Sequence, residues 1–88
     1  MSEAHFLRGQ ALKQVGDTAG AARAWLAAFS EAPQGPRAAD ALVNLGSALG
    51  DLGQGAEACM TLGEVPVRYP GSAAASLALK EQARLGCS

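Results

Sequence analysis

The sequence predicts an all-α fold built from antiparallel helix pairs, and three observations support this prediction. Alanine dominates the apolar residues and isoleucine is absent, whereas strands favour β-branched side chains. Glycine and proline recur at intervals that leave helix-length segments between them. The chain also matches itself at a shift of thirty-seven residues, which is typical of helical repeats. With 88 residues, it is expected to form a single domain.

The shift of thirty-seven residues superimposes residues that end or pack helices. The matched pairs are Gly9 and Gly46, Gly16 and Gly53, Ala21 and Ala58, Trp25 and Leu62, and Pro33 and Pro70. The first glycine of each repeat falls within a helix, where a missing side chain lets a neighbouring helix approach closely. The second glycine falls where a helix must end, because glycine tolerates the left-handed conformation there. The proline then stops the second helix of each pair.

Five helices are expected, over residues 3–15, 18–31, 36–51, 55–67 and 72–85. Asp17 or Thr18 is the expected N-cap of the second helix. Pro36 suits an early position in the third helix. Ser72 is a good N-cap for the fifth helix, and Gly86 closes it. Short loops between the helices predict that sequential helices pack antiparallel.

The domain 1–88 is therefore divided into repeat one (about 2–35), repeat two (about 36–71) and a capping helix (about 72–86), and it is expected to be a fragment of a longer protein. Pro66 conflicts with this pattern, because it removes a backbone hydrogen bond and clashes with the carbonyl of Leu62. Gly63 weakens the same stretch. We expect a kink or an early end of the fourth helix there, with residues 67–69 irregular.

Composition and charge argue against several classes of function. The 7 basic residues are scattered among 8 acidic ones, so no basic stripe is present for nucleic acid or for an anionic membrane surface. No apolar run approaches the roughly 20 residues that span a bilayer. The first residues also lack the basic and apolar regions of a secretory signal.

Catalytic and metal-binding patterns are not found in the sequence. His5 has no nucleophile or acid at an interpretable spacing, and the glycines of residues 50–55 lack the strand and the Lys-Ser or Lys-Thr of a phosphate-binding loop. Two cysteines far from His5 are too few for a zinc site. We therefore expect a protein that is not an enzyme and that uses no cofactor and no metal.

The repeat resembles the tetratricopeptide (TPR) pattern of a small residue within the first helix, a turn glycine, an alanine, a large apolar residue and a closing proline. The first copy reads Gly9, Leu12, Gly16, Ala21, Trp25, Ala28 and Pro33, and the second reads Leu42, Leu45, Gly46, Leu49, Gly53, Ala58, Leu62, Val65 and Pro70. The chain departs from the pattern at His5, Thr18, Gly55 and Val65, and its period is a few residues longer than usual. The resemblance implies a right-handed superhelix of antiparallel helix pairs, here two repeats and a C-terminal capping helix, that binds protein partners.

A narrower resemblance lies in the boundary Arg68-Tyr69-Pro70-Gly71-Ser72 and the ending Arg84-Leu85-Gly86-Cys87. Together with the long period, these residues resemble the C-terminal domain of the Tol-Pal-associated YbgF family, also called CpoB. That resemblance implies a periplasmic protein that binds TolA and coordinates septal peptidoglycan synthesis with outer-membrane constriction. The signal peptide of such a protein is not present in this chain.

The family's groove is lined by the first helix of each pair. The residues that the resemblance places there are Phe6, Gln10, Lys13, Asp40, Val43, Asn44, Ser47 and Asp51. Phe6 and Val43 stand where chaperone-binding members place charge, which argues against a cochaperone role. A groove of mixed apolar and polar residues suits an extended segment or a helix.

Cys59 and Cys87 have two interpretations. Antiparallel packing of the last two helices places Cys59 opposite about Glu81, and Gly86 lets the tail fold back over the remaining distance. If the protein is periplasmic, we expect a disulfide between them that attaches the last helix to the repeats. Otherwise they are two unlinked thiols, with Cys59 buried as a small apolar residue.

Two other functions stay open at this point. A cytosolic TPR adaptor has the same repeat pattern but no need for a disulfide. A self-association module is the other alternative, because two repeats are fewer than the roughly three usually needed for independent stability.

Overall fold

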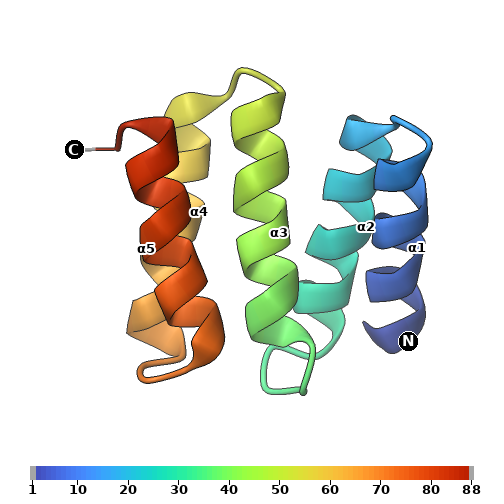
Figure 1. The fold of residues 1–88 in the computed structure, drawn as a ribbon. Helices are drawn as coiled ribbons and strands as arrows, with labels where there is room; N and C mark the ends of the chain where they lie inside the picture. Colours follow the sequence, from blue (N-terminus) through green and yellow to red (C-terminus); the bar gives the residue numbers. More distant parts are fainter. Residues whose placement is uncertain (1, 88) are drawn as a thin grey trace.

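The computed structural model describes residues 2–87, which form five helices and no strand. The helices are α1 (Ser2–Gln14), α2 (Thr18–Glu31), α3 (Ala38–Asp51), α4 (Gly55–Arg68) and α5 (Ala73–Leu85). Consecutive helices run antiparallel, and α3 lies between the α1–α2 hairpin and the α4–α5 hairpin (Figure 1). The predicted all-α class and its five helices are therefore confirmed.

The helix ends follow local chemistry. The Asp17 carboxylate accepts a hydrogen bond from the Gly20 backbone N–H at 2.9 Å, so Asp17 is the N-cap of α2. The Ser72 hydroxyl accepts from the Ala75 N–H at 3.0 Å and caps α5 in the same way. Gly86 ends α5 in the left-handed conformation, with φ of 73°. These three assignments agree with the sequence.

The expected helix bounds near two prolines were wrong. Helix α3 begins at Ala38 rather than near residue 36, because the Ala38 N–H bonds to the Gly35 carbonyl at 3.2 Å in a turn that leaves Pro36 outside the helix. Helix α4 does not end early at Pro66 but continues to Arg68, so residues 67 and 68 are helical rather than irregular. Pro66 lies in the last turn, where the Tyr69 N–H still bonds to the Val65 carbonyl at 2.8 Å, so the helix loses little.

The core lies between the helix pairs and consists mainly of alanines around a few large side chains. Trp25 of α2 and Leu62 of α4, which the repeat aligns, are 3% and 0% exposed. Each packs against a glycine in the preceding helix: a Cβ placed on Gly9 would lie 2.6 Å from Trp25 Cδ1, and one on Gly46 would lie 2.6 Å from Leu62 Cδ2. The predicted role of these glycines in close helix approach is confirmed.

Helix α5 packs against α4 and α3. A disulfide joins Cys59 of α4 to Cys87, just beyond α5. The Gln82 side-chain amide also donates to the Cys59 carbonyl at 3.3 Å, close to the position expected from the sequence, about Glu81. Cys59 is half-buried, and it is bonded rather than free. Within residues 2–87, no helix has the length and apolar character needed to cross a membrane.

Candidate protein-binding groove

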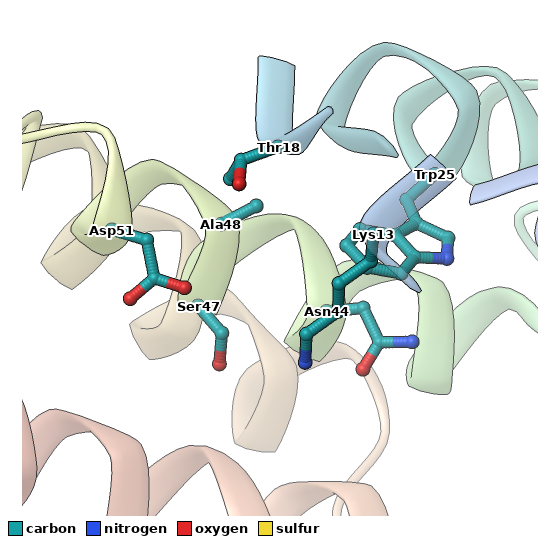
Figure 2. Close-up of a pocket in the computed structure, with 7 residues that line it drawn as sticks. All are labelled: Lys13, Thr18, Trp25, Asn44, Ser47, Ala48 and Asp51. Carbon is teal, nitrogen blue, oxygen red and sulfur yellow. The ribbon is translucent and has the colours of Figure 1, made fainter. Parts of the chain in front are cut away.

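Three adjoining hollows follow α1, α3 and α5, and we call them together the α1–α3 groove. The first is lined by Lys13, Thr18, Trp25, Asn44, Ser47, Ala48 and Asp51 (Figure 2). The second is lined by Gln10, Lys13, Gln14, Trp25 and Asn44. The third is lined by Phe6, Gln10, Arg37, Asp40, Val43, Asn44 and Leu77. Asn44 borders all three hollows, and every one of the eight groove residues expected from the sequence lines at least one of them.

The floor of the groove is apolar and its walls are polar. Trp25, Phe6 and Val43 are only 3%, 4% and 6% exposed, so they form the floor. The Arg37 guanidinium lies over the Phe6 ring, 4.7 Å from its centroid, and covers it further. Phe6 and Val43 therefore shape the groove from below and offer little open surface to a partner.

Three polar side chains in the groove have no direct partner. Within the described part of the chain, neither Gln10 nor Asn44 makes a side-chain hydrogen bond, and Lys13 has no ion pair. Figure 2 shows the Lys13 and Asn44 side chains facing the same hollow. Primary amides donate and accept at once, so Gln10 and Asn44 can match both the N–H and the C=O groups of an incoming peptide backbone.

The contribution of α5 to the groove was not predicted from the sequence. Leu77, which is 49% exposed, completes the third hollow. Glu81 and Arg84 line no hollow of the groove but contact Ser47 and Asp51, which line the first. The signal was present, because the shift of thirty-seven residues carries Asp40, Asn44 and Ser47 onto Leu77, Glu81 and Arg84.

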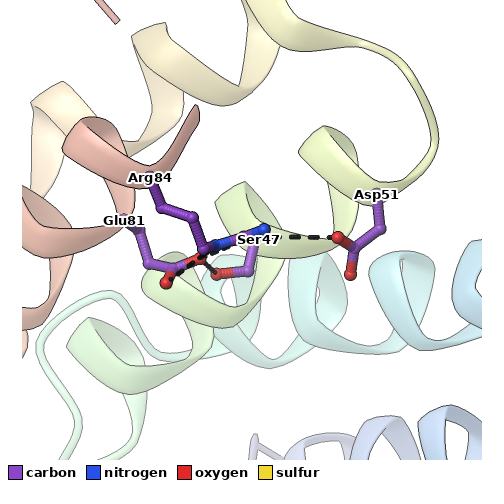
Figure 3. A network of polar contacts seen from close by, with 4 residues as sticks. All are labelled: Ser47, Asp51, Glu81 and Arg84. Atoms are coloured by element: carbon purple, nitrogen blue, oxygen red, sulfur yellow. Dashed lines mark hydrogen bonds and ion pairs between the residues drawn. The ribbon is translucent and has the colours of Figure 1, made fainter. Parts of the chain in front are cut away.

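A polar network connects α3 to α5 beside the groove (Figure 3). Ser47 Oγ donates to Glu81 Oε1 at 2.7 Å, and Arg84 Nη2 bonds to the same oxygen at 2.8 Å and lies 3.8 Å from Asp51 Oδ1. The hydrogen bonds from Arg84, and then that from Ser47, hold the pKa of Glu81 below its usual value. Glu81 in turn raises the pKa of Arg84. The network holds the α5 wall in place.

The other end of the groove carries a second ion pair. Arg37 Nε donates to Glu3 Oε1 at 2.8 Å, which joins the start of α1 to the start of α3. This hydrogen bond lowers the pKa of the Glu3 carboxyl. Asp40 lies nearby and favours the charged form of Arg37. Both ends of the groove therefore have mixed charge, which suits a partner of mixed character over a uniformly charged one.

Outside the groove, His5 pairs with Glu31 at 2.8 Å. Among residues 2–87, no three His, Cys, Asp or Glu side chains come together in a way that could hold a metal ion. The groove itself combines an apolar floor, two amide side chains and paired charges.

The fold and the groove define an all-α protein of stacked helical hairpins with a groove along its first, third and fifth helices. No protein-family model matches the sequence, and neither a curated protein nor a solved structure matches it.

Proposed function

We propose that the chain is a non-catalytic protein-binding scaffold of the TPR type, in which two repeats and the capping helix α5 form part of a right-handed superhelix. Its partner binds in the α1–α3 groove. The observation that carries this proposal is the convergence of the eight expected groove residues on three hollows that share Asn44.

The chemistry of the groove favours an extended segment of a partner protein. Gln10 and Asn44 offer unpaired amides, and the row of hollows follows the helix axes over about 10 Å from Phe6 to Lys13, since a helix rises about 1.5 Å per residue. Leu77 adds an exposed apolar edge for a partner side chain. Main-chain hydrogen bonds with apolar contacts at intervals are a recurring mode of peptide recognition.

We further propose that the scaffold works in the bacterial cell envelope, as a periplasmic protein that binds a TolA-like partner and takes part in coordinating septal peptidoglycan synthesis with outer-membrane constriction. One observation supports this choice over a cytosolic adaptor. The Cys59–Cys87 disulfide is of the kind that persists in oxidising compartments. The Arg-Tyr-Pro boundary has a structural role, because the Tyr69 hydroxyl donates to the Pro33 carbonyl at 2.6 Å and links the ends of the two repeats.

Titration of the oxidised protein with purified TolA domains tests this proposal by calorimetry. We expect saturable binding that weakens when Gln10 and Asn44 are both replaced by alanine. Arg23→Ala is the matched control, because Arg23 is exposed on α2 and lines no hollow of the groove. No binding at high micromolar concentration contradicts the assignment to TolA, and equal loss with Arg23→Ala contradicts the assignment to the groove.

Self-association is the second candidate, and three exposed apolar side chains favour it. Met60 and Val67 of α4 are each 73% exposed, and Leu79 of α5 is 57% exposed. Leu79 aligns with Leu42, which is 6% exposed because other helices cover it. Sedimentation velocity over a range of concentrations tests this candidate: association that Leu79→Glu abolishes supports it, and a monomer at all concentrations excludes it.

A further inference from the structure

Helix α5 is held to the rest of the fold mainly by small side chains. Its buried residues are Ala74, Ala75 and Ala78, whereas Leu77 and Leu79 are about half exposed. By comparison, α2 buries Trp25 and α4 buries Leu62 and Val65. Because the free energy gained on burial scales with apolar area, the buried alanines hold α5 less firmly than the large side chains hold α2 and α4.

A disulfide attaches the C-terminal end of α5 to α4. Beyond Gly86, the Cys87 N–H bonds to the Gln82 carbonyl at 2.9 Å, and this turn places Cys87 beside Cys59. The Gln82 side chain bonds to the Cys59 carbonyl at the same place. The disulfide is therefore the covalent part of a small cluster that fixes the last two turns of α5 to α4.

The same two turns contact Ser47 and Asp51 of α3, which line the groove. Glu81 and Arg84, which bond to Ser47 and approach Asp51, lie within six residues of Cys87. Leu85 packs against α3 at Gly50, where an added Cβ would lie 2.8 Å from its Cδ1. Breaking the bond at Cys87 therefore removes a restraint on Glu81 and Arg84, the residues that contact Ser47 and Asp51.

We propose that thiol–disulfide exchange at Cys59–Cys87 regulates the groove, because the bond determines how firmly the C-terminal half of α5 is held against α3. A dithiol reductant supplies two electrons and two protons: the S–S bond breaks, both cysteines become thiols, and the reductant becomes a disulfide. Both cysteines are half-buried rather than fully buried, and exchange begins when a thiolate of the reductant attacks one of the two sulfurs. The regulatory part of this inference rests on the proposed function of the groove. The looser attachment of α5 after reduction does not depend on that function.

Backbone amide exchange, followed by NMR with and without dithiothreitol, tests the movement of α5 without any partner. We expect reduction to lower protection at residues 81–85 by about tenfold or more beyond any loss that α1 and α2 share through the lower global stability. The double variant Cys59→Ser, Cys87→Ser should show the same amide protection as the reduced protein, and dithiothreitol should not change it. Leu62→Ala with the disulfide intact is the control for general destabilisation, and it should lower protection in all helices.

Unchanged protection at residues 81–85, or an equal loss in all helices as in Leu62→Ala, overturns the proposal. The regulatory part is tested with a peptide selected on the oxidised protein from a displayed random library. Weaker binding to the reduced protein supports regulation, and equal affinity in both states overturns it. Failure to select any peptide contradicts the proposed groove function instead, and the exchange experiment then still decides whether the bond controls α5.

Discussion

Trp25 packs directly against the backbone of Gly9, so closely that a Cβ on residue 9 would lie 2.6 Å from its Cδ1. The second repeat places Leu62 on Gly46 in the same way. In each repeat, α1–α2 and α3–α4, one large side chain of the second helix therefore packs directly on a glycine of the first helix. This relationship holds α1 close against α2 and α3 close against α4.

Gly9→Ala should lower the free energy of unfolding by roughly 1–3 kcal/mol, because the added methyl group clashes with the indole ring in a packed core. Gly46→Ala should behave similarly through Leu62. Urea denaturation measures both effects. Gly63→Ala is the matched control: its Cβ would meet only Gln82 Nε2 at 3.4 Å, so it should gain roughly 0.5–1 kcal/mol from helix propensity. Destabilisation of equal size at all three positions would show that close packing is not the cause.

Ser72→Ala should lower the free energy of unfolding by about 1 kcal/mol, because the hydroxyl accepts from the Ala75 N–H and donates to the Tyr69 carbonyl. Ser76→Ala makes the same chemical change one turn later, at an exposed position inside α5. It should be neutral or slightly stabilising, since alanine is the better helix former. Thermal unfolding of the two variants compares them directly, and equal effects would contradict the capping role.

Glu81→Gln should be destabilising by roughly 0.5–1 kcal/mol at pH 7 and by less in acid. The pKa of Glu81 is lowered in the folded chain, so the unfolded chain binds this proton first as the pH falls. Its contribution to stability is complete above about pH 4.3, the ordinary pKa of glutamate, and is lost as the pH falls through the lower folded-state value. Urea titrations at pH 7 and at strongly acidic pH test this, and an equal loss at both would rule out the ion pair as the source.

Reduction of the Cys59–Cys87 disulfide should lower the free energy of unfolding by roughly 3–4 kcal/mol, because the two cysteines are 28 residues apart and the bond restricts the unfolded chain. Thermal unfolding with and without dithiothreitol measures the effect. The Cys59→Ser, Cys87→Ser variant should melt like the reduced protein. Identical melting of the oxidised and reduced protein would mean that the bond adds nothing to stability.

The sequence predicts the helices well because their ends depend on local chemistry. Asp17, Ser72 and Gly86 act within a few residues of themselves, so their roles can be read directly. The prolines were misjudged because their effect depends on position within a turn. Pro66 lies so near the end of α4 that little is lost, and Pro36 lies in a turn before α3.

The groove was predicted in part. Its residues from α1 and α3 could be named because the repeat fixes which helix faces line the groove. The burial of Phe6 could not be predicted from the sequence, because it depends on Arg37, which lies over the Phe6 ring and pairs with Glu3. Leu77 was missed because the third copy of the repeat is incomplete, although the shift of thirty-seven residues reaches it.

The central claim is that a partner segment binds in the α1–α3 groove, and NMR mapping tests it most directly. The isotope-labelled, oxidised protein would be titrated with a peptide selected from a displayed random library. We predict that the largest shifts occur at the side-chain amides of Gln10 and Asn44 and at the backbone of Ser47, with little change on the exposed face of α4 around Met60. Shifts centred on Met60 and Val67, with Gln10 and Asn44 unaffected, would contradict this account.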